Sequence, residues 1–571
     1  MAAMRLSVRL LAAPVWSWFA LRQALVERRR PVVELEVGPR HPLPAPEDLD
    51  RLASARVSGL WIKLAALSGV GWATVQGVRD ALDRVRAAGV FVGVELDHVG
   101  NGELYLAAGA DRVWMRPLGS VDALGAHGRL RMAGEALARV GLRFDVESAG
   151  AYKAFGEVFT RRWPSAENRE ATRALVDDLQ AELERGIAAG RGLSEAEVRA
   201  AFAEGPHGAG EAVRRRLVDA AAYPDEVEAE LEARFGEDFP RVAFARWARV
   251  ARARARVTAW MGGGPRVVVA HLDGPVVDGD GAPGSASIAA NPVVARLEAL
   301  REDDGIAAVV LAVRSPGGSA TASDRIWRAV ARLREKKPVV AHFGDVAASG
   351  GYYLAAAATA IVAQPTTFTG SIGVVAGKPV IGDALARLGV YGESVPGAPN
   401  SGFFELDTPF SDEARARFRA RIDDTYAAFV DRVAKGRGRP VEQIEPLARG
   451  RVWSGRRAHA LGLVDALGGV DVAIRTAAAA AARGALRRVD ERLGPQVPLG
   501  LRMLRRMRGS ARLLRVWDLA GAIEGGPWAA LLASLPGPLG VLARSGGEPL
   551  TLCLEEPLSP SEDHRTSGGT A

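Results

Sequence analysis

Cysteine, lysine and long apolar runs are all scarce in this 571-residue sequence. The single cysteine, Cys553, excludes a disulfide within the chain and leaves the redox state of its compartment open. Only six residues are lysine, so 68 of the 74 cationic residues are arginine. With so much alanine and glycine, this bias indicates a coding preference, and we expect no nucleic-acid partner. It also draws attention to each lysine, because lysine can lose its proton where arginine cannot.

The N-terminal segment, residues 1–29, contains an apolar run at residues 10–21 that holds Trp16 and Trp18. This run is too short to cross a bilayer, which takes roughly 20 apolar residues. Its tryptophans favour an amphipathic helix lying in a membrane interface. A short anchor and an ordinary packed helix are the alternatives. The net charge of +7 adds an anionic membrane surface to the expected partners.

An internal repeat organises the chain, which is too long for one hydrophobic core. Three pairs of segments match in the same order, two at an offset of 248 residues and the third after a two-residue slip. The pairs are Leu104–Pro117 with Tyr352–Pro365, Gly134–Gly141 with Gly382–Gly389, and Leu217–Ala220 with Leu463–Ala466. Such collinear matches predict that residues 30–240 and 266–485 are two copies of one fold.

Short apolar strands alternate with a helical pattern in the second copy. Val267–Ala270, Ile306–Val313 and Val339–His342 are typical of buried strands. Between the last two, Ser323–Lys337 has an N-cap serine, helical spacing of apolar residues and a basic last turn. The order strand, helix, strand predicts an α/β fold with parallel sheets flanked by helices.

Two further segments lie outside the copies. Residues 241–265 carry six arginines and no acid, which predicts a basic linker, either solvated or pairing as a strand between the copies. Residues 486–571 form a basic and apolar extension that ends in a tail with a disordered composition. The extension is expected to lie on a membrane surface or to pack against the body.

Two glycine-rich turns follow predicted strands in the second copy. In the first, Gly317 and Gly318 allow the backbone to approach a ligand closely, as an oxyanion hole requires. In the second, Ser349 precedes Gly350 and an alanine-rich helix, where amides and the helix dipole favour negative charge. Ser349 as a plain N-cap is the alternative. At the repeat offset Ser349 falls on Asn101, so only the second copy has this serine.

A serine nucleophile needs a base. His342 and Asp345 precede Ser349 on the predicted strand and its turn, where they have no evident route to its hydroxyl oxygen. Lys153 in the first copy lies among small and aromatic residues, with no acid within three positions. A lysine desolvated in such surroundings has a lowered pKa and can accept a proton. The sequence therefore favours a serine from one copy and a lysine from the other, with a surface lysine as the alternative.

Five segments resemble the long, two-copy form of the signal peptide peptidase A family. They are SPGGSATAS (Ser315–Ser323), GDVAASGGYYLAAAA (Gly344–Ala358), TTFTGSIGV (Thr366–Val374), RVWSGRRAHALGLVDALGG (Arg451–Gly469) and AGAYKAFGEVFTR (Ala149–Arg161). The resemblance covers residues 30–485 and implies two tandem ClpP/crotonase-like units. One departure is Arg314, where the family commonly has Asn or Asp.

The resemblance also implies a mechanism. Ser349 becomes the nucleophile and Lys153 the general base of a Ser–Lys dyad that needs no metal or cofactor. The oxyanion candidates are Gly317, Gly318 and Gly350, and Ser371 would orient the lysine. The implied substrates are cleaved signal peptides and other unfolded or membrane-proximal chains. The implied assembly is a bowl-shaped homo-oligomer, a tetramer, at the bacterial inner membrane with its active site on the periplasmic side; a cytoplasmic location is the alternative.

Two other functions remain open from the sequence. A crotonase-like acyl-CoA enzyme would use the same fold and oxyanion hole, but no acidic catalytic pair stands beside the Gly317-Gly318 turn. A catalytically inactive scaffold at a membrane surface would depend on the basic segments instead. Labelling of Ser349 by a fluorophosphonate would separate the protease from both.

Overall fold

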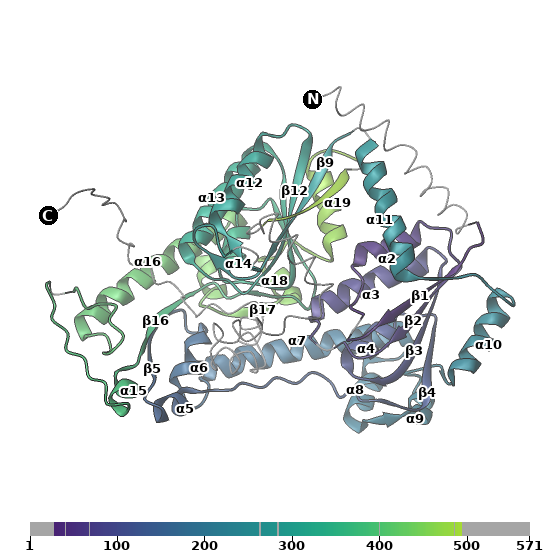
Figure 1. Cartoon of the computed structure of the whole chain (residues 1–571), viewed down its shortest axis with the longest axis horizontal. Coiled ribbons are helices and arrows are strands. Elements are labelled where there is room, and N and C mark those ends of the chain that lie inside the picture. The colour runs from purple at the N-terminus through teal and green to yellow at the C-terminus, as the bar shows by residue number, and fades with distance from the viewer. Residues whose placement is uncertain are drawn as a thin grey trace, which may run out of the picture.

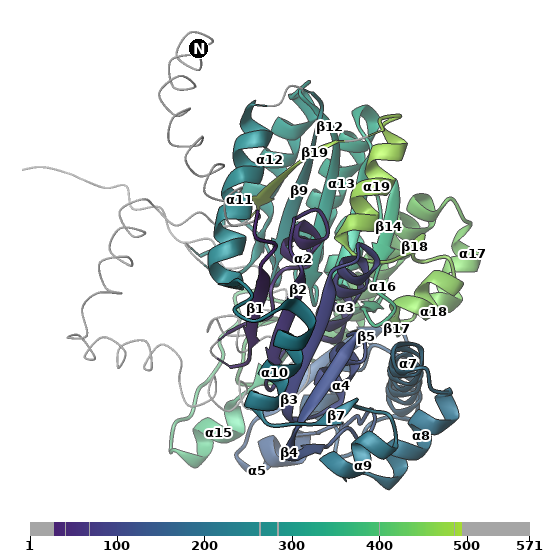
Figure 2. The same cartoon turned by 90° about the vertical axis from the view of Figure 1, so that its right-hand side faces the viewer.

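The computed structural model describes residues 28–493, except residues 40, 68, 262–263, 283–284, 399 and 485. Two α/β units follow one another along the chain and lie against each other (Figures 1 and 2). The predicted interfacial segment at the N-terminus lies almost wholly outside the described residues, as do Cys553 and most of the extension after residue 485.

A seven-stranded sheet forms the centre of the first unit, in the order β6-β4-β3-β2-β1-β8, with β7 beside β4. All neighbours are parallel except β6, which runs antiparallel to β4. The strands are β1 (Val32–Val37), β2 (Gly59–Leu64), β3 (Phe91–Val99), β4 (Arg112–Val121), β6 (His207–Gly208), β7 (Ala220–Ala221) and β8 (Arg241–Ala243).

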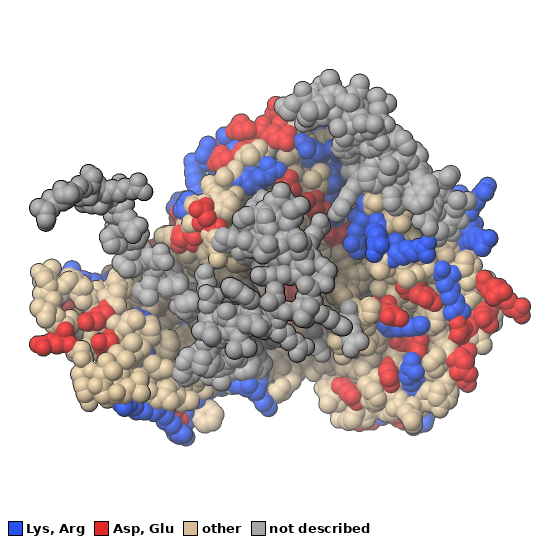
Figure 3. Space-filling view, viewed as in Figure 1, with Lys and Arg blue, Asp and Glu red and all other residues tan. Residues whose placement is uncertain are grey.

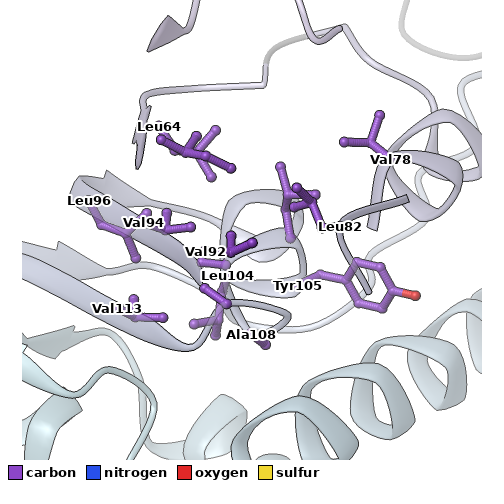
Figure 4. Close-up of a cluster of buried hydrophobic side chains, with 14 of the residues drawn as sticks. Leu64, Val78, Leu82, Val92, Val94, Leu96, Leu104, Tyr105, Ala108 and Val113 are labelled. Atoms are coloured by element: carbon purple, nitrogen blue, oxygen red, sulfur yellow. The ribbon is translucent and has the colours of Figure 1, made fainter. Parts of the chain in front are cut away.

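Helices cover both faces of this sheet. They are α2 (Pro46–Ala53), α3 (Trp72–Ala87), α4 (Asn101–Ala107), α7 (Ala166–Arg191), α8 (Glu195–Glu204), α9 (Ala209–Arg214), α10 (Pro224–Phe235) and α11 (Phe244–Met261). The main core forms because α3 places Val78 and Leu82 one turn apart, facing alternate β3 residues such as Val92 and Val94 (Figure 4). This packing is the local reason that the sequence folds into a layered α/β unit.

The second unit repeats this plan with an eight-stranded sheet. Its order is β17-β15-β13-β12-β9-β19, with β14 between β13 and β18. The strands are β9 (Arg266–Asp273), β12 (Ile306–Ser315), β13 (Val339–Ala348), β14 (Ala360–Ala363), β15 (Phe368–Gly370), β17 (Val452–Ser454), β18 (Ala466–Leu467) and β19 (Arg487–Arg492). A small parallel pair, β10 (Val276–Val277) with β11 (Ile288–Ala289), lies beside the sheet.

The helices of the second unit also correspond to those of the first. They are α12 (Ala290–Glu302), α13 (Ala320–Lys336), α14 (Gly350–Ala355), α16 (Asp412–Arg437), α17 (Val441–Ile444), the 3-10 turn η2 (Glu445–Leu447), α18 (Gly455–Ala460) and α19 (Val470–Ala480). Helix α13 begins three residues before the predicted start. Its N-cap is Ser319, whose side chain accepts a hydrogen bond from the Ala322 amide, while Ser323 lies inside the helix.

The segment predicted as a basic linker, 241–265, differs from a solvated connection. Strand β8 joins the first sheet beside β1, and α11 follows it. Phe244, Trp247, Ala248 and Ala251 recur at helical spacing along α11 and are buried in the first unit's core. The second unit ends in the same way, because β19 pairs in parallel with β9 beyond the predicted boundary at residue 485. Each sheet therefore takes its last strand from the chain just beyond the predicted copy, β8 after α10 and β19 after α19.

A two-stranded arm links the units (lower left in Figure 1). Strand β5 (Arg143–Ala149) of the first unit pairs antiparallel with β16 (Val374–Val380) of the second. The arm also carries α5 (Gly134–Arg139), η1 (Ala154–Gly156), α6 (Glu157–Thr160) and α15 (Gly382–Arg387). Helix α16 packs on this ribbon, burying Phe410, Phe418 and Ile422. The ribbon fixes the chain after β5 against the second unit.

Charge and apolar exposure differ between parts of the surface. Figure 3 shows basic and acidic side chains interspersed over much of one face, while the arm at its lower left is largely uncharged. Large apolar residues are exposed on this arm, among them Leu388 (78%), Tyr391 (82%) and Val395 (87%). Among the helices of the described ranges, none combines the length and the apolar character needed to cross a membrane.

Candidate active site

Ser349 stands at the turn between β13 and α14. Its φ of 53° and ψ of −121° are unusual for a residue with a side chain. Two backbone hydrogen bonds hold the turn: the Ser349 amide donates to the Gly370 carbonyl (2.9 Å), and the Tyr353 amide donates to the Ser349 carbonyl (2.9 Å). The next residue must be glycine, because a Cβ on Gly350 would lie 2.5 Å from Ser323 Oγ. A strained serine on a turn fixed this firmly is typical of a functional site.

The Gly317-Gly318 turn lies directly against this serine. Both glycines have positive φ angles, 108° and 149°. A Cβ on Gly317 would lie 2.6 Å from Ser349 Cβ and 2.9 Å from the Gly350 nitrogen. Val276 holds the turn from its other side, accepting from the Ser319 amide and donating to the Gly317 carbonyl, both at 2.9 Å. The turn therefore opens a space beside Ser349 only because it lacks side chains.

The three predicted oxyanion residues differ in what they offer. The Gly317 amide already donates a hydrogen bond to Ser315 Oγ at 3.2 Å. This glycine therefore provides space beside Ser349 and not a hydrogen-bond donor. The Gly350 amide is at the first position of α14, where an amide has no partner within the helix. The Gly318 nitrogen lies 3.2 Å from the point where a Cβ on Gly350 would stand. The geometry thus favours the amides of Gly318 and Gly350 as donors toward an oxygen bound beside Ser349.

Lys153 reaches the same point from the first unit. It follows β5 at the end of the turn that begins at Gly150, which has a φ of 101°. The Lys153 side chain is buried, with Nζ 3.1 Å from Ser349 Oγ, 2.9 Å from the Ser371 carbonyl oxygen and 3.0 Å from Ser371 Oγ. The structure thus brings together the predicted serine and lysine, which come from different copies.

Burial lowers the pKa of Lys153 from its ordinary value to about 7, and desolvation is the cause. The three contacts suit a neutral amine. Its two N–H groups match the two oxygens of Ser371, which leaves the nitrogen lone pair toward the Ser349 hydroxyl. At neutral pH a substantial fraction of Lys153 is therefore uncharged and able to accept a proton.

Ser371 also adopts a positive φ, 50°, which turns both its carbonyl and its hydroxyl toward the lysine. Its amide donates to the Arg451 carbonyl at 2.7 Å. Gly370, just before it, permits this turn with a φ of 79°, since a Cβ there would lie 2.9 Å from the Arg451 carbonyl oxygen. The backbone of Ser371 is thus fixed before any substrate binds.

The other candidate base lies elsewhere. His342 occupies the face of β13 opposite Phe343, which packs against Tyr352 in the main core. Burial lowers the pKa of His342 to about 4, and its Nε2 atom has no hydrogen-bond partner among the described residues. Asp345 accepts hydrogen bonds from the amide (2.8 Å) and hydroxyl (2.7 Å) of Thr74, in the first turn of α3. Neither side chain contacts Ser349.

The corresponding position in the first copy contains a carboxylate. Asn101, which aligns with Ser349, bonds with its amide group to the backbone of Gly125. Glu103 accepts hydrogen bonds from the amides of Gly100 (3.1 Å) and Leu67, the latter in the turn that corresponds to Gly317-Gly318. In the first copy a side-chain carboxylate is therefore held by two backbone amides close to Asn101, the residue that aligns with Ser349.

Two features of the site were missed in the sequence. Arg314 was noted there only as a departure, and the structure shows that it pairs at 2.7 Å with Asp273 on the neighbouring strand β9. Arg451 contacts the residue beside Lys153, although only its position in the RVWSG segment drew attention to it. No local pattern indicates that contact, because its partners lie about 300 residues earlier in the chain.

Models of known protein families match this chain. The model of "Peptidase family S49" matches twice, at residues 85–236 and 331–483, which together make up more than half of the chain. The chain belongs to peptidase family S49. A Clp protease model also matches, at residues 284–367. The predicted family and the predicted pair of ClpP-like α/β units are therefore confirmed.

Curated relatives resemble between 30% and 74% of the chain. Serine protease SPPA of the Arabidopsis thaliana chloroplast is 30% identical over 74% of this chain and 63% of its own length. Protease 4 of Salmonella typhi is 30% identical over 74% of this chain and 69% of its own length. A putative signal peptide peptidase SppA of Enterococcus faecium is 33% identical over 30% of this chain and 51% of its own length. The match thus spans less than two thirds of the chloroplast relative.

Proposed function

We propose that this S49 member is a serine endopeptidase in which Ser349 is the nucleophile and Lys153 the general base. One observation carries the proposal: a buried lysine, with a pKa lowered to about 7, lies 3.1 Å from the hydroxyl oxygen of a serine on a strained turn. A general base must lie within hydrogen-bond reach of the proton it takes and must be partly unprotonated at the working pH. Lys153 meets both conditions.

In the first step, Ser349 Oγ forms a bond to the carbonyl carbon of the scissile peptide while its proton moves to Lys153 Nζ. The carbonyl oxygen becomes an oxyanion, which accepts hydrogen bonds from the amides of Gly318 and Gly350. The new ammonium is stabilised by hydrogen bonds inside the protein, because both oxygens of Ser371 and the Oγ atom of Ser349 surround it. Ser371 therefore orients the lysine in both of its protonation states.

In the second step, the tetrahedral intermediate collapses and the peptide C–N bond breaks. Lys153 returns its proton to the departing amine, leaving an ester on Ser349 Oγ. A water molecule then attacks this ester while Lys153 takes up one of its protons. Collapse of the second intermediate returns that proton to Ser349 Oγ and releases the new carboxylic acid. Atoms and charge balance without any further reactant.

The proposed substrates are cleaved signal peptides and other unfolded or membrane-proximal chains. Support comes from relatives whose names are Protease 4 and signal peptide peptidase SppA. We propose a homo-oligomer, a tetramer, at the bacterial inner membrane, with the site on the periplasmic side and an anionic lipid surface as partner. Exposed Leu388, Tyr391 and Val395 on the arm support contacts between copies, because solvent-exposed apolar side chains gathered on one element mark interaction sites.

A fluorophosphonate probe tests the chemistry. Wild-type protein is expected to be labelled on Ser349, and the Ser349→Ala variant should not react. Lys153→Met should remain folded yet label slowly, because its serine has no base. Labelling of another residue, or equal rates with and without Lys153, would refute the dyad. No labelling of the wild-type protein would instead favour a catalytically inactive scaffold or an acyl-CoA enzyme on the same fold.

A further inference from the structure

Arg451 of the second copy contacts the residue next to Lys153 in the first. Its guanidinium lies 4.8 Å from the ring centre of Tyr152 and 4.4 Å from that of Trp453. It also donates to Glu170 of α7 at 2.7 Å, and Glu170 in turn accepts from the Tyr152 hydroxyl at 3.0 Å. The Arg451 side chain is only 16% exposed, although Glu170 is 56% exposed. These three side chains, Arg451, Tyr152 and Glu170, form a latch between the copies.

The backbone around Arg451 connects the same two regions. The Tyr152 amide donates to the Arg449 carbonyl (2.8 Å), and the Ser371 amide donates to the Arg451 carbonyl (2.7 Å). Gly450 lies between them against Lys153, since a Cβ on Gly450 would stand 2.6 Å from Lys153 Cβ. The segment 449–451 therefore lies between the turn that carries Lys153 and Ser371, the residue proposed to orient the lysine.

We propose that Arg451 is a positioning residue: with Glu170 and Tyr152 it holds the backbone of Lys153 at the distance from Ser349 and Ser371 that proton transfer requires. The inference rests on the proposed function and adds a residue that touches neither substrate nor the reacting atoms.

Lys153 needs an external support because no charged partner fixes it. Its lowered pKa is caused by desolvation, with no charged group contributing. Two ion pairs lie beside the turn, Arg451 with Glu170 and Arg449 with Glu445 at 2.9 Å, and neither contributes to the pKa shift of Lys153. Loosening the turn by 1 Å would lengthen the contact to Ser349 and admit water. Misplacement on this scale costs on the order of a hundredfold in rate, and hydration moves a lysine pKa back upward.

The test compares two ion pairs that link the copies through α7. Arg451→Ala removes the latch, and Arg457→Ala removes the pair with Asp178 at 2.7 Å, which does not contact the lysine turn. In the full-length protein, kcat for a fluorogenic peptide should fall roughly ten- to a hundredfold in Arg451→Ala, with KM changed much less. The ionisation that controls kcat/KM should move upward by about one pH unit. Arg457→Ala should keep the wild-type kcat and pH profile.

Milder variants keep the proposal testable if Arg451→Ala does not fold. Glu170→Gln should show the same upward shift in smaller measure, and Arg451→Lys should recover only part of kcat, because lysine cannot stack on Tyr152. A wild-type pH profile in Glu170→Gln, or equal losses in the Arg451 and Arg457 variants, would overturn the proposal. Failure of the proposed function looks different, because wild-type hydrolysis would then not depend on Ser349 and Lys153.

Discussion

Lys153 and Ser349 are 196 residues apart in the sequence, and their nitrogen and oxygen atoms lie 3.1 Å apart. The antiparallel pairing of β5 with β16 makes this possible, because Ala149 at the end of β5 pairs with Val374, three residues after Ser371. Each copy thus carries half of the proposed dyad, and the ribbon between them sets the distance. The two copies share one fold but differ in the residues that each contributes to the proposed dyad.

The first prediction is that neither copy hydrolyses peptides alone. Residues 28–261 and 264–493, made separately to include β8, α11 and β19, should each be inactive and unreactive toward a fluorophosphonate. Circular dichroism checks that each is folded, and mixing them tests for recovery. Hydrolysis by residues 264–493 alone would indicate a base within the second copy, and His342 would be the first candidate to test.

Gly317→Ala should nearly abolish activity. The new Cβ would lie 2.6 Å from Ser349 Cβ, on a backbone with a φ of 108°. Displacing Ser349 should reduce kcat/KM on the order of a hundredfold, and the strained backbone should cost about 1–3 kcal/mol of stability. Steady-state kinetics and urea unfolding measure the two effects.

Gly192→Ala is the matched control for this substitution. Gly192 also has a positive φ, 62°, but nothing lies within 4 Å of its would-be Cβ. It should lose stability without losing kcat/KM per folded molecule. Equal activity losses in the two variants would mean that backbone strain, and not the space beside Ser349, explains the Gly317 result.

His342→Leu should retain activity and improve resistance to acid. The folded pKa of His342 is about 4 against an ordinary 6.5, so the unfolded chain binds more protons between these values. Stability therefore falls as pH decreases from 6.5 to 4, by about 3 kcal/mol from this group. Urea unfolding across this range should show a shallower fall in the variant. Loss of peptide hydrolysis in His342→Leu would instead assign the histidine a catalytic part.

Lys153→Met should be more stable than wild type at neutral pH. The folded pKa of Lys153 is about 7 and its ordinary value 10.5, so the unfolded state holds the extra proton between them. Stability should rise with pH through this window by about 5 kcal/mol in wild type, and the rise should disappear in the variant. Unfolding free energies at pH 6 to 10.5 measure it. A variant no more stable than wild type would mean that the lysine is solvated.

Much of the fold could be predicted because the sequence contains two copies of the same pattern. Matching segments identify the repeat, and apolar strands such as Ile306–Val313 lie inside the observed β12. Strand β19 (Arg487–Arg492) could not be recognised, because at an edge it carries mostly charged residues. One of these side chains finds its partner far away in the sequence, because Arg488 pairs with Glu47 at 2.8 Å. Helix α11 was missed although its apolar spacing is visible, because its five arginines and its lack of acidic residues favoured a basic linker.

Part of the proposed site could likewise be predicted from the sequence, and part of it could not. Ser349 and its glycines are local features of a turn, and Lys153 stands out among few lysines. Their mutual distance depends on a strand pairing between residues more than 200 positions apart, which no periodicity specifies. The separate roles of Gly317 and Gly318 also required the structure, since only the backbone geometry shows which amide donates to Ser315.

The pH dependence of kcat/KM in wild type and Lys153→Arg tests the central claim most directly. If Lys153 is the general base, wild-type activity rises through one ionisation near pH 7 and is level in the alkaline range. Lys153→Arg should be folded but inactive across this range, because arginine stays charged. A wild-type profile still climbing at pH 10, or full activity in Lys153→Arg, would contradict the assignment of Lys153 as the base.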